Sequence, residues 1–181
     1  ARIGATRGSW DLTAFSGRSQ DPSTSGTFRQ IASGLSGTFH WNGKHATTLT
    51  ALTAYEKDDP VYALSGVPAR DEIASVMHKY HPGGNLSATM EAASNMRREQ
   101  GSAATHNQAY RFALAGRFRS VSGEVEAYAI DRDFLPIAEG SARNLRSDRR
   151  GVKARGAWQI SGLFTLGGEA EEYETDSTGV R

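Results

Sequence analysis

The chain has 181 residues and a formal net charge of +1 at pH 7. That length suits one domain spanning residues 1–181, and the near balance of charge gives no global field to attract nucleic acid. The absence of cysteine excludes disulfides, thiolate metal sites and cysteine nucleophiles. No apolar run approaches the roughly 18 residues of a transmembrane helix, and the start lacks a signal-peptide pattern, so we expect a processed protein or an excised fragment.

The first third of the sequence predicts β-strands. Apolar and polar residues alternate from Trp10 to Ala14, and again from Ile31 to Trp41. The second of these segments leads into Asn42-Gly43, a dipeptide typical of a tight hairpin turn. Residues 45–55, which follow the turn, are rich in Thr, Ala and Leu and are interpreted as the returning strand.

Residues 71–99 support two interpretations. Asp71 could cap a helix, because apolar residues follow it at helical spacing from Ile73 to Tyr80. Asn85 could cap a second helix, rich in Met, Glu, Ala and Arg, which are good helix formers. A pair of strands is favoured over a helical hairpin, and both remain open at this point.

The clearest strand runs from Gln108 to Ser120, where residue character changes with a period of two. The same alternation continues through 124–131 and 151–166. In the strand from Gln108 to Ser120 the alternation separates two faces. One carries Tyr110, Phe112, Leu114, Gly116 and Phe118, and the other carries Arg111, Ala113, Ala115, Arg117 and Arg119.

Short and long connections alternate along the chain. The short ones are expected near Asn42-Gly43, 82–85, 122–123 and 161–162, and the long polar ones near 18–26, 58–71, 99–107 and 135–149. We therefore predict an all-β fold, an antiparallel up-and-down β-barrel of about 8–9 strands or a segment of a larger barrel.

The segments 109–118 and 156–164 resemble strands of Gram-negative outer-membrane β-barrels. The resemblance implies that one face of each strand contacts lipid and that the other faces a polar lumen. A second, smaller resemblance lies in Gly8-Ser9-Trp10, which is similar to the G-x-W on the first strand of lipocalins, soluble barrels that bind apolar ligands.

Two sets of candidate residues follow from the barrel interpretation. The pore-lining candidates are Arg111, Arg117, Arg119, Glu124, Glu126, Lys153, Arg155 and Gln159. The candidates for contact with lipid, or with a ligand in a soluble barrel, are Trp10, Phe112, Leu114, Phe118, Trp158, Ile160 and Phe164. A lumen lined by arginines would favour anionic solutes; the alternative is a solvated face, with Glu124 and Glu126 offsetting some of the arginines as cross-strand pairs.

The sequence shows no catalytic or cofactor motif. No nucleophile elbow, phosphate-binding glycine loop or zinc-protease motif is present. His78 and His81 are separated by helical spacing, and on a strand they would point to opposite faces. We therefore expect no catalytic residues, no metal site and no cofactor.

The leading hypothesis is a non-enzymatic, porin-like protein of the bacterial outer membrane that passes small polar solutes or serves as an envelope anchor. Its expected partners are membrane lipid or lipopolysaccharide and small polar or anionic solutes; the basic run 143–150 could meet lipopolysaccharide phosphates, and the alternative is a solvated loop with Asp148 among the arginines. One alternative is a secreted or periplasmic lipocalin-like barrel that binds an apolar ligand. Another is an α+β enzyme in which residues 71–99 are helical.

Overall fold

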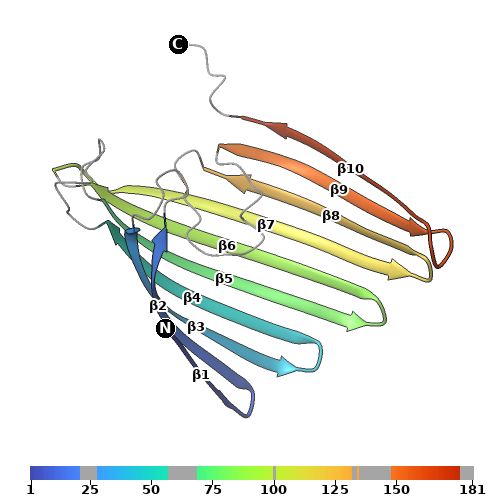
Figure 1. Ribbon diagram of the computed structural model, residues 1–181, viewed down its shortest axis with the longest axis horizontal. Helices are drawn as coiled ribbons and strands as arrows, with labels where there is room; N and C mark the ends of the chain where they lie inside the picture. Colours follow the sequence, from blue (N-terminus) through green and yellow to red (C-terminus); the bar gives the residue numbers. More distant parts are fainter. Residues whose placement is uncertain (21–27, 57–68, 100, 132–133, 135–147, 176–181) are drawn as a thin grey trace.

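The computed structural model describes residues 1–20, 28–56, 69–99, 101–131, 134 and 148–175. These residues form a single sheet of ten strands (Figure 1). The strands are β1 (Arg2–Arg7), β2 (Trp10–Gln20), β3 (Phe28–Asn42), β4 (His45–Glu56), β5 (Ala69–Gly83), β6 (Leu86–Glu99), β7 (Thr105–Phe118), β8 (Val121–Ile130), β9 (Arg149–Gln159) and β10 (Thr165–Glu174).

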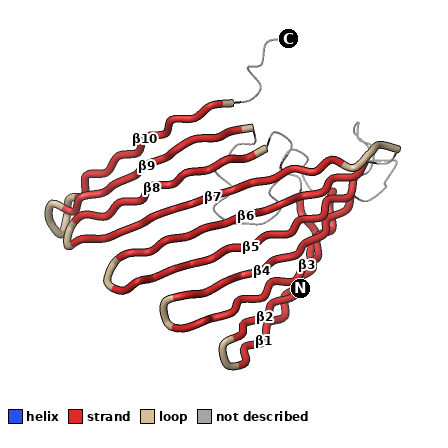
Figure 2. The backbone as a smooth tube through the Cα atoms, turned by 180° about the vertical axis from the view of Figure 1, so that it is seen from behind, coloured by secondary structure: helices blue, strands red, loops and turns tan. Residues whose placement is uncertain are grey.

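Each strand pairs antiparallel with the next strand in the sequence, so the sheet is an up-and-down meander (Figure 2). Short turns join alternate pairs of strands at one end of the sheet, which we call the turn end. The connections at the opposite end comprise residues 21–27, 57–68, 100–104 and 131–148, and we call this the loop end. The long connections predicted near 18–26, 58–71 and 135–149 lie mostly outside the described residues.

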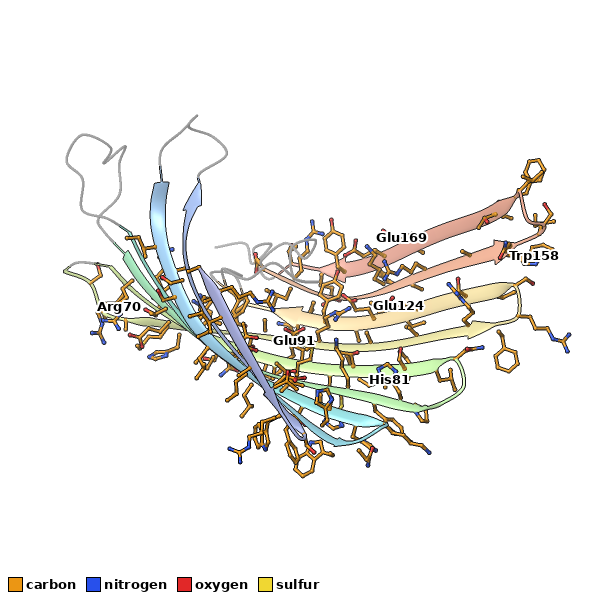
Figure 3. All side chains as sticks on the ribbon, turned by 60° about the horizontal axis from the view of Figure 1, so that its bottom comes forward. Arg70, His81, Glu91, Glu124, Trp158 and Glu169 are labelled. Carbon is orange, nitrogen blue, oxygen red and sulfur yellow. The ribbon has the colours of Figure 1, made fainter. Side chains whose placement is uncertain are left out.

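The sheet is curved and open. β1 and β10 are its two edges, and they do not pair with each other (Figure 3). The prediction of an all-β, antiparallel, up-and-down fold is confirmed, whereas closure into a barrel is not seen. The open arc is consistent with a segment of a larger barrel.

Two sequence predictions need correction. There are ten strands rather than about 8–9, because the alternation across the six residues of β1 was not recognised. The second correction concerns only the alternative for residues 71–99: the favoured pair of strands is confirmed as β5 and β6, and the helical hairpin is wrong. Pairing with β4 on one side and β7 on the other overrides the helix propensity of its residues.

The register divides the sheet into two faces, because directly paired residues lie on the same side. We call the side that carries Arg111 and Glu126 the polar face, and the side that carries Phe112 and Val125 the apolar face. Large side chains of the apolar face are exposed, namely Trp10, Leu12, Leu35, Leu49, Val76, Met90, Phe112, Leu114, Val125, Val152, Trp158 and Leu166.

The buried residues lie on the polar face. A small cluster of Tyr128, Ile130 and Phe134 packs there, near the loop end. The buried polar and charged side chains lie on the same face, namely Asp71, Asn95, Asn107 and Glu126. The usual arrangement of a water-soluble sheet, with apolar residues covered and polar residues exposed, is therefore reversed.

A substitution at Gly34 tests how closely side chains pack on the polar face of β3. A Cβ at this position would lie 2.6 Å from the Phe15 ring and 2.7 Å from the Ala51 carbonyl oxygen. We expect Gly34→Ala to lower the free energy of unfolding by about 1–3 kcal/mol, because the ring must move. Urea unfolding followed by tryptophan fluorescence measures this.

Gly17 supplies the matched control. It lies on the polar face of β2 in open space, so Gly17→Ala should leave stability unchanged or slightly raised. Equal losses in the two variants would contradict the described packing of Phe15 over β3.

Candidate functional site: the charged wall of the polar face

The candidate site is a set of charged side chains on the polar face of β7 to β10. Period-two alternation along each strand places acidic and basic residues at the same level on neighbouring strands. Glu124 pairs in register with Arg155, and Glu126 pairs with Lys153. We call this set the charged wall; its members are Arg111, Glu124, Glu126, Lys153, Arg155, Glu169 and Glu171.

Arg111 sits at the most enclosed part of the charged wall. Its Nη2 lies 2.6 Å from Glu126 Oε2 and 3.6 Å from Glu124 Oε1. The side chains of Arg111 and Glu126 are 14% and 11% exposed, so water screens this pair only partly. One guanidinium therefore holds two carboxylates of β8 at adjacent inward positions.

The chain of contacts continues across β9 to β10. The Arg155 guanidinium donates to Glu124 Oε2 through both Nε, at 3.1 Å, and Nη2, at 2.5 Å. Lys153 Nζ lies 2.8 Å from Glu169 Oε1, and the Tyr128 hydroxyl donates to Glu171. Each basic side chain of the charged wall is thus matched by a carboxylate on an adjoining strand.

This pairing changes the expected chemistry of the wall. The sequence alone left open whether Arg111, Lys153 and Arg155 form a positive surface or are offset by glutamates. The structure places all three within ion-pair distance of Glu124, Glu126 or Glu169. A surface of paired charges is strongly polar and binds water, yet it exerts little net field on an approaching ion.

The other pore-lining candidates lie at the turn end. Arg117 and Gln159 are on the polar face and exposed. Arg119 is in the turn between β7 and β8, with a φ of 49°, so it does not share the strand face predicted for it. These three residues lie beyond the ion pairs of the charged wall.

The candidates for lipid or ligand contact gather on the opposite side of the sheet. The register places Trp10, Phe112, Leu114, Phe118 and Trp158 on the apolar face. Ile160 and Phe164 are exposed in the connection between β9 and β10, which is closed by a 2.9 Å hydrogen bond from Ile160 N to Phe164 O. None of these seven side chains contributes to the buried cluster of the polar face.

The polar face of β1 to β5 differs from the charged wall because hydroxyl groups dominate it. Ser36 contacts Thr50 at 3.1 Å, and Thr38 contacts Thr48 at 2.9 Å. Asp11 lies beside them, 2.7 Å from both Thr6 Oγ1 and His40 Nε2. This half of the face is polar with few charges.

Sequence reasoning missed the contribution of β10. Glu169, Glu171 and Tyr173 share the polar face, and the guanidinium of Arg149 lies 3.7 Å above the Tyr173 ring. The signal was present as alternation from Gly167 to Glu174, but its glutamates also occupy the other face at Glu172 and Glu174. Of the basic run 143–150, residues 143–147 lie outside the described residues, and Arg149 and Arg150 belong to β9.

Sequence reasoning also missed Asp71 and Asn95, which are almost completely buried on the polar face near the loop end. Arg97 Nη1 lies 3.7 Å from Asp71 Oδ2. In the helical alternative for residues 71–99 Asp71 is a helix cap, and its position within β5 rules that alternative out. In the part of the chain that the structure describes, no three His, Cys, Asp or Glu residues form a metal-binding group.

Comparison with known proteins gives no relative: no family model, curated protein or solved structure matches this sequence. The described residues contain no helix long and apolar enough to cross a membrane. Function is therefore inferred from the two faces of the sheet.

Removal of one carboxylate from the charged wall tests its pairing. In Glu126→Gln, Arg111 keeps only Glu124, which it shares with Arg155. We expect a loss of about 1–3 kcal/mol in the free energy of unfolding, because a largely buried cation loses its closest partner. Glu172→Gln, on the apolar face of β10, is the control and should change stability by less than about 0.5 kcal/mol. A smaller effect at Glu126 than at Glu172 would contradict the enclosed pairing.

Proposed function

We propose that this chain is part of the wall of a bacterial outer-membrane β-barrel, with a non-enzymatic role in the passage of small polar solutes or in envelope anchoring. The observation that supports it is the reversed distribution of the two faces. Large apolar side chains are exposed on one face of nearly every strand, whereas the buried charged side chains, among them Asp71 and Glu126, lie on the other. Lipid is the solvent that stabilises such an exposed face.

The apolar face is also zoned along the strands in the manner of a membrane-spanning surface. Aromatic rings gather at the turn end, where Trp10 and Phe39 lie 4.6 Å apart and Phe39 and Trp41 lie 4.8 Å apart, measured between centroids. Tyr80, Phe118 and Trp158 occupy the same end on later strands (Figure 3 labels Trp158). Aromatic girdles at the lipid–water boundary are a general feature of membrane barrels.

Charges on the apolar face are confined mostly to the loop end. Arg70 and Glu72 form an ion pair there at 2.9 Å, and Arg150 pairs in register with Glu174. Between this charged rim and the aromatic rings, β5 carries Ala74, Val76, His78 and Tyr80 on the apolar face. The six steps from Ala74 to Tyr80 extend about 20 Å along the strand, which is shorter than the roughly 25 Å apolar band of such barrels.

Strand length supports the same proposal. β2 to β10 have 10 to 15 residues each, and a tilted membrane-spanning strand needs about 9–11. The open edges of β1 and β10 would have to pair with further strands in a bilayer, because unpaired backbone groups are costly in hydrocarbon. The proposal is therefore a barrel to which this sheet contributes an arc.

The charged wall would face the lumen. Because its arginines are paired with glutamates, we favour neutral or zwitterionic polar solutes over anions. The hydroxyl-rich surface of β1 to β5 offers donors and acceptors to the same class of solute. Lipid contacts the opposite face.

The first test measures whether folding depends on an amphiphile. Circular dichroism and gel filtration of the purified chain, with and without detergent, should show a β spectrum and a discrete micelle-bound species only with detergent. A compact β-rich monomer in plain buffer would overturn the membrane assignment. The search would then move to an apolar ligand for the exposed face.

A matched pair of substitutions tests which face contacts lipid. Leu114 lies on the apolar face of β7, and its neighbour Ala115 lies on the polar face opposite Glu124. We expect Leu114→Arg to reduce the stability of the folded chain in vesicles by about 2–4 kcal/mol. Ala115→Arg should be tolerated better, because the new cation meets a carboxylate. A larger loss of stability in Ala115→Arg than in Leu114→Arg would indicate that the polar face contacts lipid, and it would contradict the proposal.

A further inference from the structure

Two histidines form an isolated pair on the apolar face near the turn end. His45 begins β4, and His78 lies on β5 one position diagonally across the ladder, where Thr47 is its direct partner. The His45 ring stacks on Tyr80 with centroids 4.4 Å apart, and both histidines are half-buried. Ionisable groups are expensive on a lipid-facing surface and usually mark a function.

The two imidazoles present nitrogen atoms to each other at the separation of two ligands on one metal ion. His45 Nδ1 lies 3.2 Å from His78 Nε2. At about 2.0–2.1 Å from an ion, two nitrogens lie about 2.8–3.0 Å apart in adjacent tetragonal positions and about 3.3–3.4 Å apart in tetrahedral ones, so this hydrogen-bond contact lies between the two. We propose that His45 and His78 bind a copper ion between these nitrogens.

Thr47 prepares His78 for this role. His78 Nδ1 lies 2.9 Å from Thr47 Oγ1, and the same oxygen accepts a 2.8 Å hydrogen bond from Trp41 Nε1. If His78 Nδ1–H donates to the second lone pair of Thr47, its Nε2 lone pair is free for the metal. His45 binds through Nδ1 when its proton is carried on Nε2, so neutral histidines bind without net loss of a proton.

Copper is favoured for two reasons. Among divalent first-row ions, imidazole sites bind Cu²⁺ most strongly. Met90 lies directly opposite His78 in the β5–β6 register, which brings a thioether, a soft donor, to the neighbouring position on the same face. Since only two imidazoles are present, water completes the coordination and the ion remains exchangeable. The contact itself depends on the β4–β5 register alone, whereas the argument from the cost of ionisable groups in lipid rests on the proposed function.

Trp41 serves as a built-in reporter of the site, because its indole shares Thr47 with His78. We expect Cu²⁺ added to the folded full-length chain to quench part of the tryptophan fluorescence, with reversal by EDTA. His45→Ala and His78→Ala should each raise the half-quenching concentration at least tenfold. Trp41→Phe should remove most of the quenching, whereas Cu²⁺ binding measured by calorimetry should persist and weaken by less than in His78→Ala, because the phenylalanine takes away only the indole donor to Thr47.

Control variants distinguish Cu²⁺ binding at the His45–His78 pair from Cu²⁺ binding to any exposed histidine. His40→Ala, on the polar face of β3, and His106→Ala, near the loop end of β7, should quench like the parent chain. Thr47→Val should weaken quenching several-fold and Thr47→Ser should restore it, with circular dichroism confirming the β spectrum of every variant. The proposal is overturned if His45→Ala and His78→Ala, both folded, quench at the parent concentration, or if His40→Ala weakens quenching equally.

Discussion

The structure depends on the backbone hydrogen-bond ladder that joins all ten strands, with register shifts only near strand ends in three of the pairings. Nine antiparallel pairings hold the sheet, and the described residues add only a small buried cluster around Tyr128, Ile130 and Phe134. A soluble sheet of this size would normally be stabilised by a covered apolar face. Here the hydrogen-bond ladder and the cross-strand side-chain contacts stabilise the sheet, and the apolar face is exposed to the surrounding medium.

The two faces divide the chemistry of the chain between them. On the polar face, arginines and glutamates of the charged wall pair across β7 to β10, and the most enclosed of these pairs is Arg111 with Glu126. On the apolar face, charges are confined mostly to the rim, and the aromatic rings gather at the opposite end. The exception is the histidine pair, whose isolation in an otherwise apolar band is the reason to assign it a ligand.

The all-β class and much of the wall could be predicted from the sequence, because alternation is a local signal. The strand around Tyr110 to Phe118 shows it clearly, and the register confirms the two faces read from that strand. The signal failed where it was short, as in β1, and it was ambiguous where good helix formers filled it, as in β6. In both places the deciding interaction is the pairing with the neighbouring strand, which the pattern of a single segment does not contain.

Pairings between side chains could not be predicted to the same extent. Whether Glu124 meets Arg111 or Arg155 depends on the register and on side-chain reach, and it meets both. The contact of His45 with His78 spans 33 positions in the sequence and a diagonal of the ladder. Arg119 differs for a local reason, since the tight turn after Phe118 places it at a positive φ outside the strand.

The meander has a consequence for how the chain assembles. Every strand pairs only with its neighbours in sequence, so each new pairing closes a loop no longer than one connection. Loop-closure entropy grows slowly with length, and a topology rich in sequence-local pairings reaches its native contacts quickly. Ordering can thus spread from any hairpin in both directions. If folding stops after some of the strands have paired, those strands keep their register. The last paired strand then has an unpaired edge with which the next strand in the sequence can pair.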